Sequence, residues 1–205
     1  MIYIRVNSIN MNTEPMTRTY DNATRAQKAA QTTENIIEAT EQLLADTSLE
    51  EINLNTIAQK AGVTVQTVLR HMESRDGCFS AVAEKVASRV ETQRSASEPG
   101  NVTEVIKDLI DHYEAEGKLV LNLLAQERGS SFASSLTNDG RAYHRKWVVR
   151  CFSPLLSEES SEIIDGLVVA TDVYTWKLLR LDMGRSRDTT ESIITNMVKN
   201  TLETS

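Results

Sequence analysis

Residues 57–75 read IAQKAGVTVQTVLRHMESR and predict two short helices joined by one sharp turn. From Leu54 to Ala61 the apolar residues recur at i, i+3, i+4 and i+7, which is the spacing of one buried helix face. Gly62 follows that run and can adopt the left-handed backbone that ends a helix at low cost. This combination is typical of a helix-turn-helix.

The second of these helices is expected to begin after Thr64, whose hydroxyl can cap it, and to bury Val68. Its outward residues carry hydrogen-bonding groups suited to phosphates and base edges. An ordinary αα-corner in a helical core would share the same Ala, Gly and Val pattern. The polar outward face, with three basic residues against one acidic residue over residues 55–75, favours DNA binding.

The composition of the 205-residue chain, 40% hydrophobic and 25% charged, is typical of a soluble globular protein with one large or two small domains. No apolar run approaches the roughly 20 residues that a membrane helix requires. The N-terminus turns polar too early to form the core of a secretory signal. We therefore expect a cytoplasmic protein without a membrane segment.

The formal net charge of −7 is unusual for a DNA-binding protein. Residues 1–95 carry 10 basic and 12 acidic side chains, whereas residues 96–205 carry 12 and 17. The acidic excess therefore lies mainly outside the helix-turn-helix. Local basic groups, rather than the net charge, would have to hold the phosphates.

No sequence motif indicates catalysis or a bound metal. The chain has no nucleophile elbow, Walker loop, dinucleotide fingerprint or Cys-His cluster with metal-ligand spacing. Cys78 and Cys151 each lie in an apolar-periodic segment, which favours small buried side chains over a disulfide. We expect no catalytic residue, metal or cofactor, and a small helical enzyme is the least favoured interpretation.

Helical periodicity predicts an all-α chain of about nine helices, with no competing strand pattern. Residues 1–31 lack this periodicity and are predicted to form a flexible N-terminal arm. A helix from Thr32 or Thr33 to about Asp46, followed by one that Asn53 caps, completes a three-helix DNA-binding domain over residues 32–76.

Residues 77–205 are predicted to form a second, helical domain. Ser74 caps a long fourth helix, which ends near Ser95 before a boundary at Pro99 and Gly100. The next helix is expected to end at Gly117, followed by a buried apolar segment. The remaining expectations are a loop over 127–140 with one helical turn near Phe132, a helix that stops before Pro154, and helices over about 159–182 and 187–203.

Three N-terminal helices and a long fourth helix that starts at Ser74, Arg75 and Asp76 resemble the TetR family, the tetracycline-repressor-like regulators of bacteria. The motif match is strong over residues 33–80. Beyond it the chain agrees in helix order, and residues 171–184 are similar to segments near the end of some members. The resemblance implies a C-terminal domain that binds a ligand and forms a dimer.

Carried over by position, the resemblance implies contacts with DNA from residues on three helices. Those expected to contact phosphates are Asn55, Thr64, Thr67, His71 and Arg75, and those expected to face base edges are Val65, Gln66 and Arg70. Leu69 departs from the family, which usually has a phosphate-binding tyrosine there, and Met72 replaces the usual phenylalanine. Because Leu69 cannot donate a hydrogen bond, one backbone contact per half-site is in question.

The family resemblance also implies a small-molecule pocket within residues 103–180, whose occupation would shift the fourth helix. The candidate lining residues are Tyr113, Leu123, Phe132, Tyr143, His144, Trp147 and Trp176, with His112 as a further polar group. For each residue taken alone, packing in the core is the simpler explanation. An apolar or aromatic ligand is the weak expectation that follows.

A homodimer is expected, because one short helix covers few base pairs and two-fold symmetry lets two copies read a palindrome. The candidate interface residues lie on the last two predicted helices: Leu167, Val168, Thr171, Tyr174, Leu178, Ile193, Ile194, Met197 and Val198. The alternative is that these residues form the core of one subunit. Their apolar faces are wider than one chain is expected to cover, which favours a dimeric four-helix bundle.

The sequence therefore predicts a ligand-responsive transcriptional repressor. It would bind double-stranded DNA as a homodimer through the helix-turn-helix at 53–71, and a small-molecule effector would release it. The alternative is a helical protein-interaction module that has lost DNA binding, which Leu69 keeps open.

Overall fold

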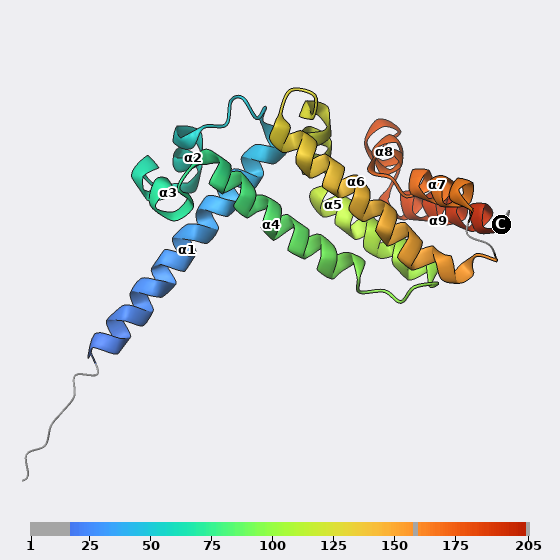
Figure 1. The fold of residues 1–205 in the computed structure, drawn as a ribbon, viewed down its shortest axis with the longest axis horizontal. Helices are drawn as coiled ribbons and strands as arrows, with labels where there is room; N and C mark the ends of the chain where they lie inside the picture. Colours follow the sequence, from blue (N-terminus) through green and yellow to red (C-terminus); the bar gives the residue numbers. More distant parts are fainter. Residues whose placement is uncertain (1–16, 158–159, 204–205) are drawn as a thin grey trace, which may run out of the picture.

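The computed structural model describes residues 17–157 and 160–203, which are helical apart from short connections. The predicted all-α fold is confirmed (Figure 1). The α-helices are α1 (Thr17–Asp46), α2 (Leu54–Ala61), α3 (Val65–Met72), α4 (Arg75–Arg94), α5 (Val102–Gln126), α6 (Ser131–Phe152), α7 (Ser161–Ala170), α8 (Val173–Lys177) and α9 (Arg187–Glu203). Within the described ranges, no helix is both long and apolar enough to cross a membrane.

The helix-turn-helix forms as its sequence predicts. The Asn53 side chain accepts hydrogen bonds from the amides of Asn55 and Thr56, which caps α2. Gly62 ends α2 with a left-handed backbone (φ 68°), and the Thr64 hydroxyl caps α3 by accepting from the Thr67 amide. These local contacts satisfy amide groups that the helix ends would otherwise leave without partners.

Helix α1 begins at Thr17, so the predicted flexible arm is wrong for residues 17–31; residues 1–16 lie outside the described part of the chain. Thr32 and Thr33, where this helix was expected to begin, lie inside α1. Instead, the hydroxyls of Thr32 and Thr33 donate to the carbonyls of Lys28 and Ala29, one turn earlier. Residues 25–31 are exposed, and this alanine-rich stretch needs no buried face because alanine, glutamine, lysine and arginine favour helix intrinsically.

Helix α5 continues through Gly117 without a break, which corrects the predicted helix end there. A Cβ atom at position 117 would lie 2.5 Å from Trp176 Cζ3. The glycine therefore gives the indole room to pack against the α5 backbone. A sequence pattern cannot distinguish this use of glycine from a helix cap, because the partner lies 59 positions away in the chain.

The predicted loop over residues 127–140 holds for 127–130 and is wrong for 131–140, because α6 begins at Ser131. The Ser130 hydroxyl accepts a hydrogen bond from the Ala133 amide at 3.2 Å and caps the helix. Phe132 and Leu136 then pack one turn apart against the core of the DNA-binding domain, and the Phe132 and Phe79 rings lie 5.2 Å apart. This tertiary burial outweighs the poor helix propensity of the serine-rich sequence.

The single helix predicted over about 159–182 is divided at Thr171 and Asp172 into α7 and α8. Asp172 has an extended backbone and accepts from the Tyr174 amide, so it caps α8. A π-helical turn, Leu178–Asp182, follows α8. The other predicted boundaries are confirmed: α4 is capped by Ser74, α6 ends before Pro154, and α9 spans Arg187–Glu203.

Two hydrophobic clusters form the core of the described chain, and α5 and α6 contribute to both. The first joins α1 to α4 with Leu119 and Leu123 of α5, and the second joins α5 and α6 to α7, α8 and α9. Cys78 and Cys151 are free and fully buried, one in each cluster, as predicted. Helix α4 runs from the helix-turn-helix alongside α5 and so connects the two parts (Figure 1).

Candidate DNA interface and ligand pocket

Helix α3 buries Val68 and Met72 against the first cluster and exposes a polar face. Thr64, Gln66, Leu69 and Arg70 are exposed, as is Asn55 on α2. The predicted contacts Val65, Thr67 and His71 are half-buried, and Arg75 is exposed at the start of α4. Five of the nine predicted DNA contacts line one shallow hollow on this surface: Thr64, Gln66, Thr67, Leu69 and Arg70.

Several of these side chains are held in place by their neighbours. The Thr64 and Thr67 hydroxyl oxygens lie 3.0 Å apart, and His71 Nδ1 lies 2.9 Å from the Thr33 hydroxyl of α1. Arg75 Nη1 donates to the Ile52 carbonyl at 3.4 Å, and its guanidinium lies 5.2 Å from the centre of the Phe79 ring. Such support fixes the side chains before they meet a duplex.

Leu69 is 40% exposed on the same face as Gln66 and Arg70. The leucine side chain can form no hydrogen bond, either with water or with a phosphate. The side chain leaves α3 able to make an apolar contact, for instance with a thymine methyl group. Leu69, which replaces the tyrosine usual in the TetR family, therefore lies on the exposed face of α3. Met72, which replaces the usual phenylalanine, is buried.

A cavity of about 310 Å³ lies between α4, α5 and α6 and reaches the start of α8. Five of the seven predicted pocket residues line it: Tyr113, Leu123, Phe132, Tyr143 and His144. Val86 and Val90 of α4 line it too, and both are half-buried. The cavity thus touches the helix that begins at the DNA interface.

Trp147 and Trp176 do not line this cavity, which corrects two of the predicted pocket residues. Both are 3% exposed. The Trp147 indole donates to the Arg94 carbonyl at 3.1 Å, and the Trp176 indole donates to Glu114 Oε1 at 2.9 Å. Trp147 and Trp176 therefore pack in the core, which was the alternative explanation for each predicted pocket residue.

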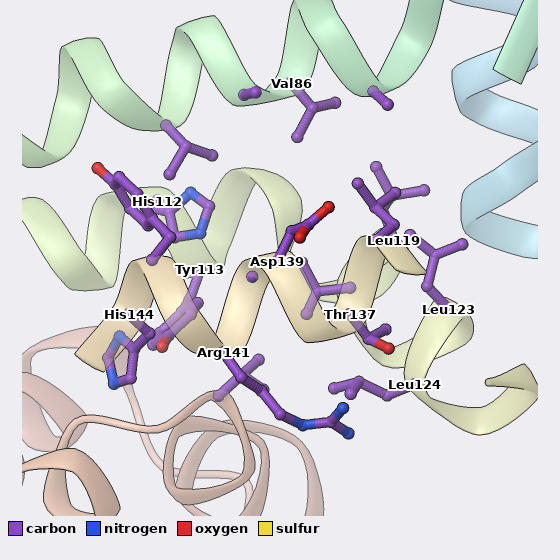
Figure 2. Close-up of a pocket in the computed structure, with 18 of the residues that line it drawn as sticks. Val86, His112, Tyr113, Leu119, Leu123, Leu124, Thr137, Asp139, Arg141 and His144 are labelled. Atoms are coloured by element: carbon purple, nitrogen blue, oxygen red, sulfur yellow. The ribbon is translucent and has the colours of Figure 1, made fainter. Parts of the chain in front are cut away.

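The cavity has a polar end and an apolar end. Figure 2 shows the rings of His112 and His144 at one end, and Leu119, Leu123 and Leu124 at the other. The polar end also contains Arg94, whose Nη1 lies 3.0 Å from His144 Nδ1. Arg94 is a functional candidate that the sequence did not reveal, because an arginine in the last turn of a helix usually faces solvent and interacts with the helix dipole.

Both histidines of the cavity are neutral near pH 7. Burial lowers the pKa of His112 to about 2 and that of His144 to about 3, and the positive charge of Arg94 adds to both effects. Burial likewise raises the pKa of the Tyr113 hydroxyl, which donates to the Thr171 carbonyl, to about 12. The imidazoles therefore act as neutral hydrogen-bonding groups.

The predicted dimer residues divide into three sets by their burial. Leu167, Thr171, Ile194 and Val198 lie in the core of one chain, with no exposed surface, so the alternative of a core within one subunit holds for them. Val168 and Ile193 are half-buried. Tyr174, Leu178 and Met197 are exposed, and the exposed apolar set also includes residues that the sequence pattern missed: Val169, Leu181 and Met183.

A comparison with known families supports the interpretation of the helix-turn-helix. Residues 36–82 match the family described as bacterial regulatory proteins, tetR family. This part of the chain is therefore similar to TetR-family regulators. The matched residues run from the middle of α1 into α4 and include all nine predicted DNA contacts.

Solved structures share the fold over most of the chain. A transcriptional regulator from Rhodococcus sp. Rha1 is 14% identical, with a TM-score of 0.67 over 84% of this chain and 96% of that chain. A tetR-family transcriptional regulator from Streptomyces coelicolor is 17% identical, with a TM-score of 0.62 over 84% and 79%. The multidrug binding protein EbrR, solved with imidazole, is 15% identical, with a TM-score of 0.53 over 92% and 97%. No curated protein sequence matches significantly.

Proposed function

We propose that this protein is a cytoplasmic, ligand-responsive repressor of the TetR family that binds a palindromic operator as a homodimer. A small molecule in the cavity would release it from DNA. The observation that carries this proposal is the course of α4. One uninterrupted helix begins at Arg75 beside the recognition helix and ends at Arg94 in the cavity.

Helix α4 is well placed to transmit a change from the cavity to the DNA-binding domain. Its last residue is fixed to α6, since the Arg94 carbonyl accepts from the Trp147 indole and from Arg150 Nη2 at 2.6 Å. Its side chains Phe79, Val82 and Val86 line the same cavity. A ligand that separates α4 from α6 would therefore tilt the domain that contains α3, because packed helices move as rigid units.

The homodimer is supported by the exposed apolar side chains at the end of the chain that is remote from α3. Tyr174, Leu178 and Met183 are each at least half exposed, and they follow one another through α8 and the π-helical turn. Exposed apolar side chains that gather on one part of a surface are characteristic of a protein–protein contact. Two-fold pairing would give the two recognition helices the symmetry of a palindrome.

Replacing Gln66 by alanine is expected to relax base choice, because an amide that hydrogen-bonds base edges would be lost. Discrimination against the altered base pair should fall by about 1–3 kcal/mol. Replacing Arg75 by alanine should instead weaken binding to all sequences alike and reduce the salt slope by about one. Fluorescence anisotropy with duplexes from the DNA flanking the gene, titrated at several salt concentrations, measures both effects.

Gln59→Ala is the matched control for Gln66→Ala, since Gln59 is an exposed glutamine on α2 outside the predicted contact set. It should leave base preference unchanged. The opposite pattern, with Arg75 controlling base choice and Gln66 controlling only the salt slope, would show that α3 docks on DNA in another orientation.

The second candidate function is a protein-interaction module whose helix-turn-helix no longer binds DNA. The exposed Leu69 favours it, because an apolar residue on the recognition face suits a protein partner better than a phosphate. Leu69→Tyr separates the two functions: it should strengthen DNA binding by a regulator and leave a module without DNA binding unable to bind any duplex.

A further inference from the structure

The polar end of the cavity contains a buried positive charge without a carboxylate partner. Arg94 is 5% exposed, and no aspartate or glutamate of the described ranges forms an ion pair with it. Its Nε atom is buried without a hydrogen-bond partner among those residues. Arginine stays protonated in proteins, and a buried charge is costly unless it is paired.

Aromatic rings surround this guanidinium but do not satisfy it. The Arg94 Cζ atom lies 5.1 Å from the ring centre of Trp147, 5.3 Å from that of Tyr113 and 5.8 Å from that of Tyr143. Ring faces attract a cation by electrostatics, yet they offer no strong hydrogen-bond acceptor. The Nε–H group of Arg94 therefore has no acceptor among the described residues and is left for a ligand.

The two histidines differ in their free hydrogen-bonding capacity. His144 Nδ1 faces the Arg94 donor, so its proton sits on Nε2, which lies 3.1 Å from the Thr171 hydroxyl oxygen; that hydroxyl donates to the Leu167 carbonyl. Both ring nitrogens of His144 thus have hydrogen-bond partners. His112 is 4% exposed and its Nδ1 is buried without a partner in the described part of the chain. The His112 ring therefore has a donor or acceptor to offer.

The remaining charges around the cavity favour a ligand with a single negative charge. Arg141 also lines it, but Arg141 Nη2 is paired with Glu127 Oε2 at 2.6 Å and its guanidinium points away from the histidines (Figure 2). Asp172 caps α8, and Asp139 is exposed to solvent. A dianion such as a phosphate monoester would need more positive charge than Arg94 supplies.

The other end of the cavity suits hydrocarbon. Leu119, Leu123 and Leu124 lie there, opposite Val86 of α4 (Figure 2). The volume of about 310 Å³ is near the lower end of the range for small-molecule sites, roughly 300–1,000 Å³. A short apolar chain, rather than a large drug-like molecule, matches this space.

We propose that the cavity binds a monocarboxylate with an apolar body about the size of octanoate, with the carboxylate on Arg94 and His112 and the hydrocarbon among the leucines. The proposal rests on the proposed function in treating this cavity as the effector site. Beyond that function, it names the chemical class of the effector, a monocarboxylate, and the residue that confers selectivity for it, Arg94. The guanidinium gives the carboxylate paired N–H donors, and neutral His112 supplies one more.

Isothermal titration of the full chain with octanoate at pH 7.5, without DNA, tests this directly. Octanoate should bind at least about tenfold more tightly than octanamide, which has the same shape without the charge. Arg94→Met should remove that preference. Arg145→Met, which removes a half-exposed positive charge of α6 outside the cavity lining, should leave octanoate affinity within about twofold.

The melting temperature without ligand separates a binding role for Arg94 from a structural one. Arg94→Met should melt at the same or a higher temperature, because it removes an incompletely paired buried charge. A lower melting temperature together with unchanged octanoate affinity would overturn the proposal. So would equal binding of octanoate and octanamide by the unaltered protein, or no binding of octanoate at millimolar concentration.

The comparison of octanoate with octanamide needs no variant, so the test stands even if Arg94→Met does not fold. Because it contains no DNA, its failure would leave the repressor function intact and assign the cavity to another ligand class. Failure to bind a palindrome, in turn, would overturn the repressor function without affecting the carboxylate site.

Discussion

Arg89→Met is expected to destabilise the protein by about 2–3 kcal/mol, because it would leave Glu116 buried without its cation. Arg89 Nη2 on α4 lies 2.6 Å from Glu116 Oε1 on α5 and 2.5 Å from Glu41 Oε1 on α1. The Glu116 side chain is 6% exposed. Breaking a fully buried pair costs about 3–5 kcal/mol, and we expect less here because the Arg89 side chain is 33% exposed.

The loss should depend on pH in a defined direction. Burial raises the pKa of Glu116, and Arg89 opposes that rise, so removing Arg89 raises the pKa further. A carboxyl with a raised folded-state pKa favours the folded protein at low pH and loses this advantage as pH rises through that pKa. Chemical denaturation should therefore show the largest difference between Arg89→Met and the unaltered protein near pH 7 and a smaller one near pH 5.

The double variant Arg89→Met/Glu116→Gln is the matched test, because the amide removes the more deeply buried of the two carboxylates that lose their cation, Glu116 and Glu41. It should recover part of the lost stability. Arg145→Met breaks the exposed pair with Asp165 instead and should change stability by less than about 0.5 kcal/mol. If the double variant were as unstable as Arg89→Met alone, packing of the Arg89 stem rather than charge pairing would explain the effect.

Gly117→Ala is expected to destabilise the protein by about 1–3 kcal/mol, although alanine normally stabilises a helix interior. The added Cβ would lie 2.5 Å from Trp176 Cζ3 and 2.6 Å from its Cη2. The indole cannot move aside freely, since it is 3% exposed and its N–H donates to Glu114 Oε1. The second hydrophobic cluster would have to shift as a whole.

Gly140→Ala provides the control within the same protein. Gly140 lies in the interior of α6, and a Cβ there would meet no atom within 4 Å. This variant should gain about 0.5–1 kcal/mol from helix propensity. Urea denaturation of the two variants should therefore give opposite signs. A stabilising effect of Gly117→Ala would show that α5 and α8 are not packed as closely as described.

The sequence predicts the helix-turn-helix well because its determinants are local. Asn53, Gly62 and Thr64 act on residues no more than four positions away, and Val68 follows the helical repeat. The errors occur where a distant partner decides the outcome. Gly117 is a packing glycine because of Trp176, and residues 131–140 are helical because Phe132 packs on Phe79.

The candidate pocket shows the same limit. The aromatic pattern identified Tyr113, Tyr143 and His144, since such residues line cavities often, but it could not separate them from Trp147 and Trp176 in the core. Arg94 was missed altogether. Its burial depends on α6, which lies about 50 positions further along the chain, and nothing in the local sequence distinguishes it from a solvated arginine at a helix end.

The most direct test of the central claim is a salt-dependent anisotropy titration of the unaltered protein on the palindromic DNA flanking its gene. At near-physiological salt, the palindrome should bind two chains and be preferred over a random duplex by at least about a thousandfold. Equal affinity for the palindrome and the random duplex, or binding as a single chain, would contradict the account of this protein as a dimeric repressor.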